Sequence, residues 1–234
     1  MTEKQTPHSQ TLSRGIRVLE ILAESPGALS ITELAEALGV HRSIAYRILR
    51  TLEDHGLVSR DSGGAVTLGP RMAYLARNVA SGIQFAARPE LVAVANELGM
   101  TCFLTALDQH ECITLLSVEP STGPGAVVQR PGSRHSISVG APGIAIQSAL
   151  SPTQWATLAT GEAERAETAQ ARARGYATSH DEVIPGVSSI AIPFLLEGQP
   201  PFAIGAVFIS SKIDAASVAA RLLLAAERIH ATLG

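Results

Sequence analysis

The sequence predicts an α+β protein with an N-terminal winged helix-turn-helix and a C-terminal antiparallel sheet of about six strands, on which helices pack. Two observations support this fold class. Residues 13–54 repeat apolar side chains at the spacing of helices, and a hairpin signal follows them. From Met100 the apolar spacing changes to two, which is typical of half-buried strands.

The chain has 234 residues, 46% of them apolar, and a net charge of −3, which suits one large or two small globular domains. The charge is unevenly distributed. Residues 1–81 contain nine Lys/Arg and eight Asp/Glu, whereas the remainder contains nine and thirteen. Any nucleic-acid contact must therefore come from a local basic patch rather than from the protein as a whole.

The two cysteines, Cys102 and Cys112, have no metal-binding spacing, and we expect small buried hydrophobes rather than a disulfide. The first ten residues are polar and show no apolar signal region, and no apolar run approaches 18 residues. These features predict a cytoplasmic protein without a membrane span. No residue pattern indicates a cofactor.

Residues 1–10 are predicted to be a disordered tail, and 13–24 a helix. Two further helices joined by a sharp turn should follow. Ser30 and Glu33 have the spacing of a capping box, which marks the start of the first. Gly39 permits the left-handed backbone that a tight turn needs. Such a pair is typical of a helix-turn-helix, whose second helix enters the DNA major groove.

The second helix of the pair, residues 41–54, should bury one apolar face and expose a basic one. No acidic residue lies between positions 41 and 50. The alternative is an ordinary solvated amphipathic helix. We expect Val40, Ile44, Ala45, Ile48 and Leu52 to be buried. The residues assigned to DNA binding are Thr32, His41, Arg42, Ser43, Tyr46, Arg47 and Arg50.

Two short strand-like segments in 57–68 flank the turn signal Ser62–Gly63–Gly64 and predict the wing. Arg60 lies near the predicted wing tip, where it either reaches a phosphate or the minor groove, or is simply an exposed hairpin arginine. We add it to the DNA-binding set.

Gly69–Pro70 begins a connecting helix over 71–81, and another helix over about 83–98 should kink or break at Pro89. The predicted domains are a DNA-binding domain at 11–69, a linker helix at 70–82 and a second domain at 83–234. Asp214 is expected to cap the last helix. In the second domain the predicted strands are 101–107, 111–118, 126–130, 135–139, 188–196 and 202–210, with a further short strand-like segment at 175–178. The predicted helices are 141–150, one from 152, 162–174 and 215–233.

Several short motifs follow one another along the chain. They are Arg14–Leu22, Leu34–Ala35, Leu38–Val40, Arg47–Leu52, Gly56–Val58, Leu68–Pro70, Gly175–Tyr176, Asp181–Glu182, Pro185–Pro193 and Gly205–Ser210. With these motifs the chain closely resembles bacterial transcriptional regulators of the isocitrate-lyase-regulator (IclR) type, from Ser13 to Gly234.

The resemblance implies a linker helix and an effector domain similar to GAF and PAS sensors. It also implies homodimers, often paired into homotetramers, that bind double-stranded operator DNA as repressors or activators. The effectors of such regulators are usually small organic or aromatic acids.

Carried over residue by residue, the family's effector pocket is lined here by Ala141, Pro142, Gly143, Ser179, Ser189, Ala191, Phe208 and Ser210. Hydroxyls beside backbone N–H groups at a helix start can hold a carboxylate. Three positions depart from the family pattern. Ile144 stands where a basic residue is usual, Ser179 where many members have an acid, and Phe208 where a serine is common. These changes favour a larger, more apolar ligand, or no ligand, over a short carboxylate.

Two other functional classes compete. One is a helix-turn-helix regulator without a small-molecule ligand, which acts through protein or subunit contacts. The other is an enzyme, but the sequence lacks the HExxH, GxSxG, P-loop and GxGxxG motifs. The run His180–Asp181–Glu182 could bind a metal, although adjacent loop residues point in different directions. We therefore assign no catalytic or metal-binding residue.

Overall fold

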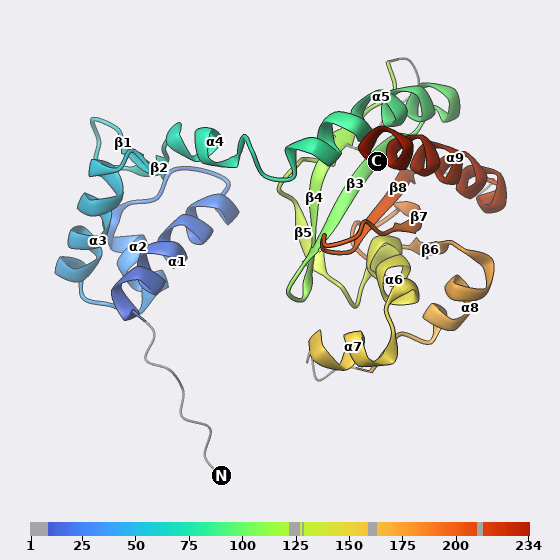
Figure 1. Cartoon of the computed structure of the whole chain (residues 1–234). Coiled ribbons are helices and arrows are strands. Elements are labelled where there is room, and N and C mark those ends of the chain that lie inside the picture. The colour runs from blue at the N-terminus through green and yellow to red at the C-terminus, as the bar shows by residue number, and fades with distance from the viewer. Residues whose placement is uncertain (1–8, 122–126, 128, 159–162, 210–212) are drawn as a thin grey trace, which may run out of the picture. The chain divides into compact units, whose positions relative to one another are not determined.

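The computed structural model describes residues 9–121, 127, 129–158, 163–209 and 213–234. The chain divides into two compact units between Val79 and Ala80, here called unit 1 and unit 2 (Figure 1). Residues 1–8 of the predicted tail lie outside the described residues. In the part that is described, every helix is too short or too polar to cross a membrane.

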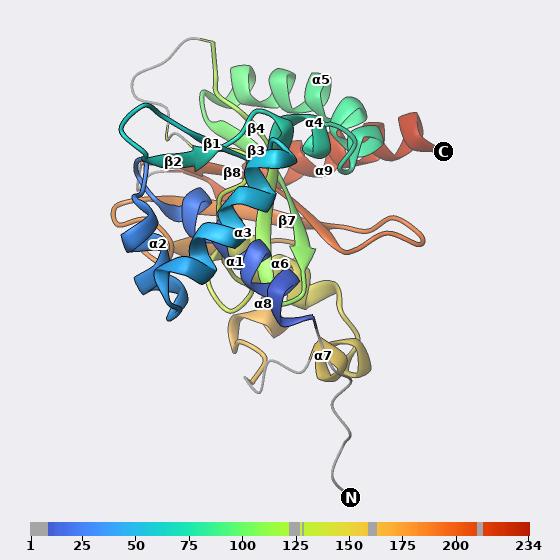
Figure 2. The same ribbon diagram turned by 90° about the vertical axis from the view of Figure 1, so that its left-hand side faces the viewer.

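Unit 1 consists of three helices, a short hairpin and a fourth helix (Figure 2). Its core combines Val18 and Leu22 with Leu34, with Ile48, Leu49 and Leu52, and with the hairpin residues Val58 and Val66. Leu29 also bridges to Val66. The elements are α1 (Gln10–Glu24), α2 (Ile31–Leu38), α3 (Arg42–Asp54), β1 (Val58–Arg60), β2 (Val66–Leu68) and α4 (Arg71–Ala76).

The predicted capping box is confirmed. The Glu33 N–H donates to the Ser30 hydroxyl at 3.2 Å, and the Ser30 N–H donates to the Glu33 carboxylate at 2.7 Å. These contacts lower the pKa of Glu33, chiefly through the backbone hydrogen bond at Ser30. Gly39 then ends α2 with φ 62°, a left-handed conformation that favours glycine. Local interactions therefore stabilise α2 and the turn that follows it, and this turn sets the direction of α3.

The connecting segment differs from the prediction of one helix over 71–81. Helix α4 ends at Ala76, and none of its side chains is buried within the described part of the chain. Ala80 adopts φ 48°, which interrupts the helical path before α5 begins at Ser81. Helix α5 (Ser81–Leu98) then continues through Pro89, where a kink or break had been expected.

Unit 2 is built on an antiparallel sheet with the strand order β5-β4-β3-β8-β7-β6 among the described residues, which confirms the predicted fold class. Helices α5 and α9 cover one face and α6 the other (Figure 1). The elements after α5 are β3 (Thr101–Asp108), β4 (Glu111–Val118), β5 (Arg134–Ser136), α6 (Gly140–Ala149), α7 (Pro152–Leu158), α8 (Glu167–Arg174), β6 (Ala177–His180), β7 (Ser188–Phe194), β8 (Phe202–Phe208) and α9 (Ala215–Leu233).

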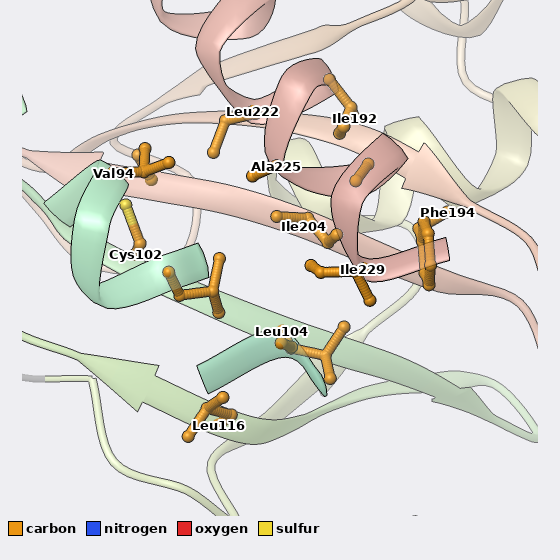
Figure 3. Close-up of a cluster of buried hydrophobic side chains, with 14 of the residues drawn as sticks. Val94, Cys102, Leu104, Leu116, Ile192, Phe194, Ile204, Leu222, Ala225 and Ile229 are labelled. Carbon is orange, nitrogen blue, oxygen red and sulfur yellow. The ribbon is translucent and has the colours of Figure 1, made fainter. Parts of the chain in front are cut away.

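The larger core of unit 2 lies between the sheet and the helices α5 and α9. Leu222, Ala225 and Ile229 of α9 pack onto Ile192 and Ile204 of the sheet (Figure 3). Asp214 caps α9, as predicted, by accepting from the Ala216 N–H. Cys102 and Cys112 are free buried thiols whose desolvation raises the pKa of each to about 12.

Some predicted boundaries move. The strand expected at 135–139 is β5, at Arg134–Ser136, and the helix expected from 162 begins at Glu167. The strand expected at 126–130 is not found at its described positions 127, 129 and 130, and positions 126 and 128 lie outside the described residues.

Candidate functional site

Helix α3 presents a continuous polar and basic stripe to solvent. Arg42, Ser43, Arg47 and Arg50 are exposed, and Tyr46 is 46% exposed. Thr32 is also exposed, near the start of α2. Ala45, Ile48, Leu49 and Leu52 are buried on the opposite side of α3. This division leaves the arginines of the stripe free of packing roles.

His41 is the N-cap of α3. Its Nδ1 accepts the Ser43 N–H at 3.3 Å and lies 2.9 Å from the Ser43 hydroxyl. These contacts between His41 and Ser43 thus fix the position of both side chains and define the first turn of the helix.

Arg60 lies against α3 rather than at the wing tip. Its guanidinium is 3.0 Å from the Glu53 carboxylate and 5.7 Å from the centre of the Tyr46 ring, and its side chain is 22% exposed. The strands of the wing are only three residues long, so the last residue of β1 lies beside the helix. The turn beyond it carries Asp61, whose carboxylate accepts the Ala65 N–H.

Ile44 was expected to be buried but is 37% exposed, and Leu49 is buried in its place. Ile44 lies one residue from Ser43 and three from Arg47, so it extends the stripe with an apolar group. The helical spacing of Ile44 and Ile48 suggested one shared apolar face, and only the packing of α1 and α2 decides which side chains that face buries.

Unit 2 contains a cavity of about 100 Å³ beside the N-terminus of α6. Of the residues predicted to bind an effector, Pro142, Ser179 and Ser189 line it. The Ser189 hydroxyl is buried, and no hydrogen-bond partner for it is found in the described part of the chain. The other lining residues are Phe103, Gln129, Ser133, Arg134, His135, Gly140, Val183, Ile184, Val187 and Val207.

The remaining predicted effector residues do not line this cavity. Ala191 is buried in the core under α6, and Phe208 packs on the opposite face of the sheet. Strand alternation explains Phe208: it pairs with Ser188, whereas Val207 pairs with Ser189 and therefore shares the cavity face. Ser210 lies outside the described residues.

Gly143 is required for packing. A Cβ on this residue would lie 2.1 Å from the carbonyl oxygen of Ile137, because α6 crosses that backbone closely. Ala141 is fully buried. Sequence reasoning missed Phe103, Gln129 and His135 at the cavity. The two-residue period of 101–107 and a correct strand register would have placed Phe103 there, but no local pattern points to the other two.

The backbone N–H groups at the start of α6 already have acceptors from the chain. The Ala141 N–H donates to the Ser179 hydroxyl at 2.9 Å, and the Gly140 N–H donates to the Glu182 carboxylate at 2.8 Å. Arg165 binds that carboxylate at 2.7 Å and also pairs with Glu167. The carboxylate expected from a ligand at this helix start is therefore replaced by that of Glu182.

Desolvation opposes the ionisation of Glu182, but hydrogen bonds from Arg165 and Gly140 outweigh it and lower its pKa. The pKa of Glu167 is lowered from 4.5 to about 2, chiefly by its hydrogen bonds with Arg165. Lowered pKa values in the folded state stabilise unit 2 above pH 4.5, and this contribution is lost as the pH falls towards 2.

We therefore expect Glu182→Gln to reduce the stability of unit 2 at pH 7 and to reduce it progressively less below pH 4.5, where protonation of Glu182 weakens the same contacts. Urea midpoints of wild type and variant at pH 7, 4 and 3 measure this difference. A difference that stays constant over this range would contradict the assigned ion pair.

The metal alternative finds no support in the geometry. His180 Nε2 lies 2.9 Å from Asp181, whereas the Glu182 carboxylate binds Arg165 and Gly140. Across the residues with described positions, no three His, Cys, Asp or Glu side chains are grouped as a metal site.

Two family models match the chain. The IclR helix-turn-helix domain matches residues 11–62, and the bacterial transcriptional regulator IclR C-terminal domain matches residues 77–231. An HTH-type transcriptional regulator from Mycobacterium tuberculosis is 31% identical over 77% of this chain and 75% of its own. The transcriptional repressor IclR of Escherichia coli is 29% identical over 91% of this chain and 84% of its own.

Solved structures share the fold. An IclR transcriptional regulator from Alicyclobacillus acidocaldarius superposes with a TM-score of 0.82 at 26% identity, covering 97% of this chain and all of its own. An IclR homologue from Microbacterium hydrocarbonoxydans, solved as a complex with 4-hydroxybenzoate, gives 0.81 at 21% identity and covers 96% and 99% of the two chains.

Proposed function

This chain belongs to the IclR family of bacterial transcriptional regulators, and we propose that a small organic molecule bound in unit 2 modulates its binding to operator DNA. The relatives named above are regulators rather than enzymes. The observation that carries the DNA-binding part of the proposal is the exposed, acid-free stripe on α3, which a capped helix and a glycine turn hold in place.

In the proposed complex α3 enters the major groove. Arg42, Arg47 and Arg50 bind phosphates or guanine edges, and Ser43 and Tyr46 add hydroxyl contacts. Ile44 contacts a thymine methyl, the apolar group that the major groove offers. Arg60 acts indirectly, because its contacts with Glu53 and Tyr46 orient the phenol ring.

We further propose that the protein binds DNA as a homodimer, or as a dimer of dimers, so that two copies of α3 read half-sites related by a two-fold axis. Exposed apolar side chains on α1, on α4 and at Val79 are the candidate contacts for this self-association. They are Leu12 and Ile16 on α1, Tyr74 and Leu75 on α4, and Val79.

The cavity beside α6 is the proposed effector site. A small organic or aromatic acid is the effector class that the family resemblance implies, and the 4-hydroxybenzoate of the Microbacterium homologue supports a compound of one ring. Ligand binding would shift the dimer geometry through residues 70–82, provided that the ligand binds the two geometries unequally.

A saturating effector is expected to change operator affinity by about fivefold or more, the lower end of typical allosteric coupling. Linkage requires that saturating operator change effector affinity by the same factor. Fluorescence anisotropy with duplexes selected from a random pool measures the first quantity, and ligand titration with and without duplex measures the second. A bound ligand that leaves operator affinity unchanged would contradict this regulatory step.

A further inference from the structure

The cavity beside α6 combines apolar walls with two buried polar atoms. Phe103, Val187 and Val207 contribute apolar surface. The Ser189 hydroxyl and the Gln129 Oε1 are buried without a hydrogen-bond partner in the part of the chain that is described. Ser189 is 9% exposed, and the Gln129 Nε2 already donates to the Thr114 hydroxyl at 2.9 Å. Both residues line the cavity, and each has a polar atom whose hydrogen-bonding capacity is unused among the described residues.

These two atoms define what a ligand must supply. The Gln129 oxygen only accepts, so it requires a donor, and the Ser189 hydroxyl can donate or accept. A ligand hydroxyl satisfies both requirements. An ionised carboxylate only accepts, so it would leave the Gln129 oxygen without a donor.

Positive charge at the cavity is already neutralised. Arg134, the guanidinium among the described lining residues, is 3.0 Å from the Glu111 carboxylate. Burial lowers the pKa of His135, which favours the uncharged ring. At the start of α6 the N–H groups of Gly140 and Ala141 already bind Glu182 and Ser179, and the Glu182 carboxylate is paired with Arg165 at 2.7 Å. The described lining residues therefore offer an anionic ligand no unneutralised cation, and these two N–H groups at the helix start are already bound.

We infer that the cavity binds a small uncharged hydroxy compound with an apolar body of about one ring, such as a phenol or an aromatic alcohol, rather than a carboxylate. The size of the cavity agrees with a ligand of about one ring. One buried water needs about 10–15 Å³, so the cavity of about 100 Å³ has room for on the order of seven to ten groups the size of a water molecule. This inference rests on the proposed function, since it names the ligand of the same site.

The direct test compares benzyl alcohol with benzoate, which are alike in shape but differ in charge. Titrations of the full-length wild-type chain at pH 7, followed by ligand-observed NMR, give the two dissociation constants. We expect benzyl alcohol to bind at least about tenfold more tightly than benzoate, because only benzoate brings an unbalanced charge into the cavity. Equal or tighter binding of benzoate would overturn the inference, and so would the failure of both compounds to bind.

Two variants locate the effect, each with a matched control. Ser189→Ala should weaken benzyl alcohol binding about fivefold. Ser188→Ala, the adjacent serine, bonds to His180 and does not line the cavity, so it should change little. Glu182→Gln removes one of the two carboxylates that pair with Arg165, so it leaves more uncompensated positive charge beside the start of α6 and should strengthen benzoate binding about tenfold. Glu164→Gln, which removes an exposed carboxylate paired with Arg172, should not.

The outcomes separate this inference from the proposed function. Tighter benzyl alcohol binding that Ser189→Ala and Ser188→Ala weaken equally would overturn the assigned site. The inference stands if benzyl alcohol binds as expected, even where it leaves operator affinity unchanged. That result would instead contradict the regulatory step. Conversely, if benzoate bound and changed operator affinity, the proposed regulatory function would stand and the inference of an uncharged ligand would be overturned.

Discussion

Simultaneous replacement of Arg47 and Arg50 by alanine is expected to weaken operator binding roughly 1,000-fold. A dimer would bind DNA with four fewer guanidinium groups, and about 1 kcal/mol for each corresponds to nearly three factors of ten. The slope of log affinity against log salt concentration should also fall by about 1 for each phosphate that the variant no longer binds. Anisotropy titrations at several salt concentrations measure both effects.

The fold should tolerate this double substitution. Both arginines are exposed, and the only described ion pair involving them joins Arg50 to Asp54 at 3.5 Å on the helix surface. Exposed pairs of this kind contribute about 0.3–0.5 kcal/mol. Arg17→Ala is the matched control, because Arg17 is an exposed arginine of α1 that pairs with Glu20 in the same unit. It should leave operator affinity nearly unchanged.

Retention of full DNA binding by the double variant would instead favour a helix-turn-helix used for protein contacts.

The same assay tests the proposed contact of Ile44. Ile44→Ala should lose affinity for duplexes that contain thymine, and the loss should disappear when uracil replaces thymine, because uracil lacks the methyl group. A loss that is the same on both duplexes would contradict the methyl contact.

The second large effect concerns stability. Gly143→Ala is expected to lower the free energy of unfolding of unit 2 by about 3 kcal/mol, the upper range for inserting a methyl group into a packed core. The added Cβ would lie 2.1 Å from the Ile137 carbonyl oxygen, which is backbone and cannot rotate away. For a unit of this size the melting temperature should fall by roughly 6–12 °C. Differential scanning calorimetry measures the shift.

Gly82→Ala is the control for this prediction. Gly82 also lies in a helix of unit 2, but a Cβ on it meets none of the described residues within 4 Å. Alanine there should be neutral or slightly stabilising, by up to about 1 kcal/mol, because it has the higher helix propensity. If Gly143→Ala were as stable as Gly82→Ala, the close crossing of α6 over Ile137 would be wrong.

Much of the fold could be predicted because it depends on neighbours in sequence. The Ser30–Glu33 capping box, the glycine turn at Gly39 and the Asp214 cap each involve residues at most four apart, and the structure has all three. The alternation in 101–107 and the apolar runs after Ser188 likewise predicted the antiparallel sheet. Prediction failed where tertiary packing determines which side of a helix is buried. Ile44 was predicted to be buried, but it is exposed on α3.

The candidate site was only partly predictable. The basic stripe of α3 follows from helical spacing alone, so Arg42, Arg47 and Arg50 could be located in advance. In unit 2, the family resemblance pointed to Pro142, Ser179 and Ser189, which line the cavity. The resemblance also pointed to Phe208, which lies on the other face of the sheet, because neighbouring residues of a strand point to opposite faces.

Family membership, fold class and the exposed arginines of α3 can thus be inferred from local spacing and motif order. The chemistry of the cavity cannot. Glu182 reaches the Gly140 N–H across 42 residues, and Arg165 joins the same carboxylate from another segment. Such contacts exist only once strands and helices have assembled, because desolvation, charge balance and unpartnered atoms are properties of neighbours in space. For that reason only the tertiary structure shows which polar and charged groups surround the cavity of unit 2.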